Sequence, residues 1–113
     1  MILGIGTDLV EVARLEESLE RTPTLRSRLF TPAEADLPTQ SLAARFAAKE
    51  ALVKALGAPS GLSWQDAEVV TDEDGKPAFE LTDTLAARVG DHRVHLSLSH
   101  DGGFALAFVV IES

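Results

Sequence analysis

The residues best suited to chemistry in this 113-residue chain are the charges of residues 45–54, Arg-Phe-Ala-Ala-Lys-Glu-Ala-Leu-Val-Lys. Wound as a helix at about 100° per residue, this segment places Arg45 and Lys49 within an apolar arc and Glu50 at its border. Because an unpaired charge is costly to bury, we expect this face to open onto an anion such as a phosphate, with Glu50 free to hold a cation. An ordinary helix surface is the alternative. Glu50 would then pair with Lys54 four residues on, and the other basic side chains would extend to solvent.

A second acid, Asp8, follows an apolar segment that contains two glycines. We expect it at the C-terminal end of a strand, where a metal site can form. Two carboxylates far apart in sequence suit magnesium, which takes one or two protein carboxylates and completes its shell with waters and substrate phosphates. With Asp8 and Glu50 as ligands, the basic residues of 45–54 would face those phosphates, a set suited to transfer at a pyrophosphate. As an alternative, residues 8–11 match a helix capping box, in which Asp8 would only accept backbone N–H bonds.

A third cluster is Ser-Leu-Ser-His-Asp at residues 97–101. It is no catalytic triad, because alternation along a strand directs Ser99 and His100 to opposite faces. We expect Ser99 or His100 to bind a phosphate or a base at the strand end, whereas Asp101 and the following glycine make a turn. Lys76, in a Gly-Lys-Pro turn, is a further candidate for contact with an anionic ligand.

The elements that must position these residues are predicted from hydrophobic periodicity and turn signals. We expect strands over residues 2–7, 67–71, 78–81, 94–99 and 104–111, and helices ending near residue 21, starting at Thr31, and spanning 41–56 and 82–90. Gly4 and Gly6 share one face of the first strand and leave room for a neighbouring backbone or a ligand. Helices early and mostly antiparallel strands late predict a single α+β domain over residues 1–113, with helices packed on the sheet.

Size and charge limit the function. A chain of 113 residues is small for an enzyme that encloses a substrate, so an oligomer with shared surfaces is favoured. The net charge of −8 argues against nucleic-acid binding. Residues 21–30 nevertheless carry three arginines and no acid, which indicates one acidic partner or simply an uneven solvated surface. The chain has no cysteine, no recognisable export signal and no segment as long as a membrane span, so we expect a soluble cytoplasmic domain.

These motifs resemble a known family. Residues 6–11, 45–51 with Lys54, 75–77 and 97–101 occur in the order and approximate spacing found in the holo-[acyl-carrier-protein] synthases, the small bacterial 4′-phosphopantetheinyl transferases. The resemblance covers nearly the whole chain. The central Phe-x-x-Lys-Glu-x-x-x-Lys pattern and the N-terminal Gly-Thr-Asp are its most specific parts.

The resemblance implies the fold of these transferases and a role in fatty acid biosynthesis. The 4′-phosphopantetheine arm of coenzyme A would move to a serine of an apo acyl carrier protein, with release of adenosine 3′,5′-bisphosphate. The implied magnesium ligands are Asp8 and Glu50, and the implied catalytic residues are these two acids and Lys54. Coenzyme A contacts are implied for six residues: Arg45, Lys49, Lys54, Lys76, Ser99 and His100.

Partners are implied as well. Arg14 and Arg21, on one face of the first helix, would meet an acidic helix of the carrier, and the family is typically a homotrimer with active sites between subunits. Two rival functions use the same residues. One is a magnesium-dependent hydrolase of nucleotide pyrophosphates, and the other is a non-enzymatic adaptor that binds an acidic helix through Arg14 and Arg21.

Overall fold

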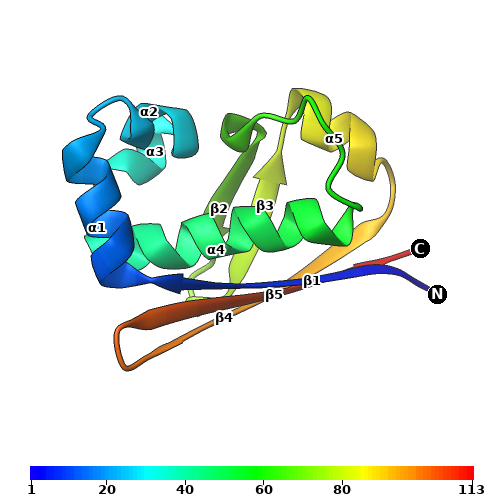
Figure 1. Cartoon of the computed structure of the whole chain (residues 1–113). Coiled ribbons are helices and arrows are strands. Elements are labelled where there is room, and N and C mark those ends of the chain that lie inside the picture. Colours follow the sequence, from blue (N-terminus) through cyan, green and yellow to red (C-terminus); the bar gives the residue numbers. More distant parts are fainter.

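The computed structural model describes all residues, 1–113. Its base is a three-stranded sheet in the order β1-β5-β4, and both strand pairings are antiparallel. The strands are β1 (Ile2–Glu11), β5 (Phe104–Glu112) and β4 (Arg93–Asp101). The longest helix, α4 (Thr39–Ala55), lies along one face of this sheet (Figure 1).

The remaining elements gather around α4. Three short helices at one end of α4 are α1 (Val12–Arg21), α2 (Leu25–Leu29) and α3 (Pro32–Ala35) (Figure 1). The side of α4 away from the large sheet is covered by a 3₁₀ turn, an antiparallel hairpin and a last helix: η1 (Trp64–Asp66), β2 (Ala67–Thr71), β3 (Pro77–Leu81) and α5 (Asp83–Val89). The predicted α+β class is confirmed, and the strands are antiparallel throughout.

Helix α4 is buried on two sides, which explains its composition. Its fully enclosed positions are mostly alanines, because large side chains would hold the two sheets apart: Ala43, Ala47, Ala48 and Ala51 are all 0% exposed. Ala47, Ala48 and Ala51 pack in one cluster with Ala107 and Val109 of β5 on one side and Val69 and Leu85 on the other. The apolar arc expected from the sequence is therefore only part of the buried surface, and Phe46 and Val53 are only half-buried.

Strand β1 and helix α4 lie very close together at Gly4 and Gly6. A Cβ atom added to Gly6 would lie 1.9 Å from the carbonyl oxygen of Ala51, and one added to Gly4 would lie 2.0 Å from that of Ala55. The expectation that the two glycines admit a neighbouring backbone is confirmed. This contact also fixes the separation between Asp8 on β1 and Glu50 on α4.

Two details differ from the prediction. Strand β1 continues to Glu11 because Leu9 and Val10 still pair with Leu106 and Ala105, so Asp8 lies within the strand and not at its end. Helix α2 and the turn η1 were not predicted, since segments of five and three residues are too short to show periodicity.

The face of the large sheet opposite α4 is apolar and open. Six large side chains of β1 and β5 on this outer face are between 41% and 60% exposed: Leu3, Ile5, Leu9, Phe104, Leu106 and Phe108. None of the helices has the length and apolar character needed to cross a membrane.

Candidate active site

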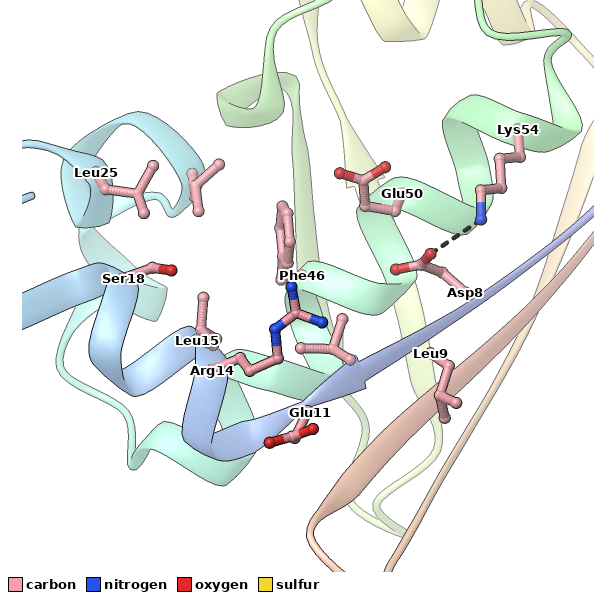
Figure 2. A pocket seen from close by; sticks show the side chains of 12 residues that line it. Asp8, Leu9, Glu11, Arg14, Leu15, Ser18, Leu25, Phe46, Glu50 and Lys54 are labelled. Carbon is pink, nitrogen blue, oxygen red and sulfur yellow. Dashed lines mark hydrogen bonds and ion pairs between the residues drawn. The ribbon is translucent and has the colours of Figure 1, made fainter.

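A cleft of about 470 Å³ lies where the end of β1, helix α1 and the middle of α4 meet (Figure 2). Its polar edge carries Asp8, Glu50, Lys54 and Arg14. Its opposite wall is apolar and includes Leu15, Leu25, Leu29 and Phe46. The sequence identified these four charged residues but missed Glu11, which also lines the cleft, and the apolar wall, whose side chains look like ordinary core residues in the sequence.

Asp8 is held by an ion pair and is not a helix cap. The ammonium of Lys54 donates to Oδ1 of Asp8 at 2.9 Å and to the carbonyl oxygen of Thr7 at 3.0 Å. Helix α1 begins four residues later, at Val12, and its N-cap is Glu11. The capping-box alternative for Asp8 is therefore wrong, and Lys54 pairs across to β1 and not with Glu50 along its own helix.

Glu50 borders the same cleft, one turn of α4 before Lys54 (Figure 2). Burial raises the pKa of Glu50, and the nearby charge of Asp8 raises it further, while Lys54 acts in the opposite direction. The ionised form of Glu50 is thus disfavoured by its surroundings. A cation placed between the two carboxylates would relieve both effects.

The donor set suits a magnesium ion. No three His, Cys, Asp or Glu side chains anywhere in the chain come together as a metal-binding group. An ion held by Asp8 and Glu50 would take its other ligands from water and from a substrate, as magnesium commonly does in phosphate chemistry. The residues present therefore fit the ion that the sequence led us to expect.

The two arginines of α1 occupy different places. Arg14 lines the cleft, as does Phe46 (Figure 2). Arg21 is the last residue of α1 and is exposed outside the cleft. A ligand that touches both must extend from the cleft along the helix.

A second pocket, of about 330 Å³, lies on the other flank of α4 and contains Arg45 and His100. Nε of Arg45 is buried and has no hydrogen-bond partner. The side-chain amide of Gln40 donates to Nδ1 of His100 at 3.1 Å. A buried guanidinium N–H without an acceptor is costly, so this pocket suits an anion that would supply one.

Lys76 and Ser99 are near this second pocket but do not line it. Lys76 is exposed between Gly75 and Pro77, which both line the pocket. Ser99 pairs with Leu106 and shares the outer face of the sheet, opposite to His100. Within one chain, the structure therefore brings Arg45 together with His100 but not with Ser99.

Lys49 is in neither pocket. Its side chain is 1% exposed and its three N–H groups are used, by Oε1 of Glu34 at 2.6 Å and by the carbonyl oxygens of Leu29 at 2.7 Å and Trp64 at 3.2 Å. Burial lowers the pKa of Lys49, and the Glu34 carboxylate opposes that shift. The expectation that Lys49 faces the phosphates does not fit this geometry, because no donor is left for a ligand.

Comparison with known proteins identifies the family of this chain. The family model described as the 4′-phosphopantetheinyl transferase superfamily matches residues 4–109. The holo-[acyl-carrier-protein] synthase of Clavibacter michiganensis is 62% identical, with 99% of this chain and 97% of the relative aligned. That of Renibacterium salmoninarum is 56% identical over the full length of both chains.

Solved structures of holo-[acyl-carrier-protein] synthases have the same fold as this chain. The holo-(acyl-carrier-protein) synthase of Bacillus anthracis, in complex with CoA (3′,5′-ADP), superposes with a TM-score of 0.83 at 40% identity and covers 100% of this chain and 98% of its own. The enzyme of Neisseria meningitidis gives a TM-score of 0.86 at 36% identity, with both chains fully covered. Sequence and fold thus agree, and the chain belongs to the 4′-phosphopantetheinyl transferase superfamily, among the holo-[acyl-carrier-protein] synthases.

Proposed function

We propose that this protein transfers the 4′-phosphopantetheine arm of coenzyme A to a serine of an apo acyl carrier protein and releases adenosine 3′,5′-bisphosphate. The observation that carries the proposal is the cleft lined by Asp8 and Glu50, two carboxylates whose charges repel, together with Lys54 and Arg14. Family membership supplies the reaction class.

Asp8 and Glu50 would hold the magnesium ion. When bound there, magnesium would offset the negative charge that develops on the phosphate oxygens. Lys54 adds a positive charge to the same site, because its side chain is half-exposed at the cleft and its ammonium lies 2.9 Å from Oδ1 of Asp8. A short shift of its flexible side chain would let it donate to a phosphate oxygen.

The reaction breaks one P–O bond and forms another. The serine oxygen of the carrier attacks the phosphorus that bears the pantetheine arm, and the bridging oxygen leaves with adenosine 3′,5′-bisphosphate. The serine proton passes to a carboxylate or a water in the cleft. In such transfers the protein contributes mainly position and charge, which is what a rigid strand–helix contact and four charged side chains provide.

The second pocket would hold the nucleotide end of coenzyme A. Arg45 has an unsatisfied buried N–H there, and His100 lies beside it. Lys76, on the adjoining turn, would reach a phosphate from outside the pocket. Lys49 would act from the interior and not as a ligand.

The carrier would bind along α1. Arg14 in the cleft and Arg21 at the end of the helix would meet acidic side chains, and the apolar wall of Leu15, Leu25 and Phe46 would receive an apolar residue. An amphipathic acidic helix has both features. This arrangement would place the carrier serine next to Asp8 and Glu50.

Three copies would form a homotrimer through the outer face of the sheet. The six exposed apolar side chains of β1 and β5 would be covered in this way, which would spare a small domain a large apolar surface in water. Ser99 lies on the same face, so it would reach a coenzyme only at a junction between copies. Each active site would then lie between two copies.

Mass spectrometry of the carrier tests the proposal. Apo carrier, coenzyme A and magnesium are incubated with the protein, and we expect the carrier to gain the mass of the phosphopantetheine arm. Glu50→Ala should abolish this gain with the fold intact, while Glu80→Ala, at an exposed position on β3, should not. Loss of coenzyme A without carrier modification would indicate a hydrolase, and carrier binding without any product would indicate an adaptor.

A further inference from the structure

The buried ion pair between Lys49 and Glu34 lies outside both pockets, yet it joins more segments than any other side-chain contact. Lys49 on α4 donates to the carbonyl oxygen of Leu29, the last residue of α2, and to that of Trp64, the first residue of η1. Its ammonium also lies 5.3 Å from the centre of the Phe30 ring. Lys49 therefore binds α4 to two segments that have no sequence proximity to it.

Glu34 completes the network from the opposite side. Its Oε1 accepts the backbone N–H of Thr31 at 3.0 Å, and its Oε2 accepts the backbone N–H of Val69 on β2 at 2.9 Å. Glu34 is 1% exposed. Every polar atom of the pair is thus satisfied within the protein, and α2, α3, α4, η1 and β2 converge on two side chains.

Stability alone is a weak reason for such a pair. Replacing a buried ion pair by apolar side chains of similar volume is often neutral or even stabilising, because desolvation of two charges offsets their attraction. Directional contacts are what the pair adds. Three carbonyl or carboxylate acceptors fix where the Lys49 ammonium lies, and so fix the rotation of α4 about its axis.

The cleft depends on that rotation and on the same contacts. Glu50 follows Lys49 directly, so any roll of α4 that frees Lys49 also moves Glu50. Leu29, whose carbonyl accepts from Lys49, lines the apolar wall with its side chain. Trp64, the other carbonyl partner, packs edge-on against Phe46 of the same wall, with ring centres 5.8 Å apart and planes at 64°.

We propose that Lys49 and Glu34 are positioning residues which hold the apolar wall of the cleft against α4 and keep Glu50 directed into it. The inference rests on the proposed transferase function for its kinetic test, but its structural part can be measured without turnover. A roll of α4 would move Arg45 as well as Glu50, but only the cleft would also lose its wall, because Leu29 lines the cleft and no partner of Lys49 lines the pocket of Arg45 and His100. Carrier recognition should therefore suffer more than coenzyme A recognition.

Lys49→Met tests the proposal, with Leu85→Ala as the matched control. Leu85 is 1% exposed, belongs to a different core cluster from Leu29 and lines neither pocket, so its truncation lowers stability without loosening the wall. In Lys49→Met protein that is folded at the assay temperature, we expect KM for the carrier to rise about tenfold and kcat to fall, with KM for coenzyme A changed less than about twofold. In Leu85→Ala, both KM values should stay at wild-type values.

Hydrogen exchange supplies the readout that needs no activity. Backbone amides of residues 26–30 should exchange about tenfold faster in Lys49→Met than in Leu85→Ala, and the emission of Trp64, the single tryptophan, should shift to the red. If Lys49→Met does not fold, Glu34→Gln is measured in its place, since an amide oxygen in the place of Oε1 can still accept the bonds from Thr31 and Lys49, and only the bond from Val69 loses its acceptor. Unchanged carrier KM and unchanged exchange in the folded variant would overturn the proposal. Absence of transfer in the wild type would refute the proposed function, and the exchange rates would still decide the positioning role.

Discussion

Gly6→Ala tests whether the contact between β1 and α4 sets the geometry of the site. The added Cβ would lie 1.9 Å from Ala51 O and 2.8 Å from Ala55 N, and both are backbone atoms that no side-chain rotation can move. A Cβ contact shorter than 3.0 Å is essentially never seen, so strand and helix must separate by at least about 1 Å, the difference between 3.0 and 1.9 Å.

The expected cost follows from that displacement. Overpacking of a close contact costs about 1–3 kcal/mol. Alanine restricts the unfolded chain and returns about 0.4–1 kcal/mol, so the steric term exceeds this gain. At about 4 °C per kcal/mol for a domain of this size, the melting temperature should fall by several degrees.

The loss of magnesium binding should be larger than the loss of stability. Metal–ligand distances tolerate changes of only about 0.2 Å, whereas Asp8 and Glu50 sit on the two elements that move apart. We therefore expect magnesium to raise the melting temperature of the wild type but not of Gly6→Ala. Leu85→Ala, which creates a cavity on the far side of the core, should lose stability yet keep the magnesium response. Wild-type stability together with a wild-type magnesium response in Gly6→Ala would refute the reasoning.

Three further predictions concern charge and assembly. Burial and the charge of Asp8 raise the pKa of Glu50, so the protonated carboxyl of Glu50 contributes stability below the ordinary carboxyl pKa, and this contribution is lost as the pH rises through the raised pKa. Without metal, the melting temperature of Glu50→Gln should exceed that of the wild type at pH 8 and equal it at pH 4. Equal melting temperatures of the two proteins at both pH values would contradict the raised pKa. Arg14→Glu should weaken carrier binding more than coenzyme A binding, and most at low salt, while Arg88→Glu on α5 makes the same charge change and should have no effect. Calorimetric titration measures the affinity for each ligand, and equal losses for both ligands in Arg14→Glu would count against the carrier role. Phe108→Asp should dissociate a trimer of about 36 kDa, three copies of 12.1 kDa, into smaller species, whereas Ala78→Asp should not. Light scattering measures the mass in solution, and an unchanged mass of Phe108→Asp would exclude the outer face as the interface.

Much of the fold could be predicted because its signals are local. The strand 67–71 and the hairpin that ends at residue 111 follow from alternation and turn residues, and the structure has them within one or two residues of the expected bounds. The facing of Gly4 and Gly6 toward a backbone also followed from period-two alternation and the absence of side chains. These features need no knowledge of distant contacts.

The partner of Lys49 could not be found in that way. Sequence reasoning treated a cation within an apolar arc as unpaired, and therefore as a sign of an anionic ligand. The partner is Glu34, fifteen residues away and read only as the third residue of a capping box, a role that it also fills. A lysine on an alanine-rich face is a signal that some buried acid must exist, but only the tertiary structure shows which.

The place of Asp8 shows the same limit. A capping box and a cleft carboxylate have the same local pattern, and the choice between them depends on how far β1 continues. Pairing with β5 carries the strand past Asp8, which leaves its carboxylate free to meet Lys54. The long-range pairing of β1 with β5, and not the local pattern of residues 8–11, therefore determines the role of Asp8.

The central claim is that Asp8 and Glu50 hold one divalent ion together. Crystals grown with coenzyme A and manganese, measured at the manganese absorption edge, test it directly. We expect one anomalous peak within about 2.0–2.3 Å of a carboxylate oxygen from each residue, and no peak in crystals of Glu50→Gln. A fully formed cleft in which the two carboxylates point apart, with no ion between them, would contradict the account.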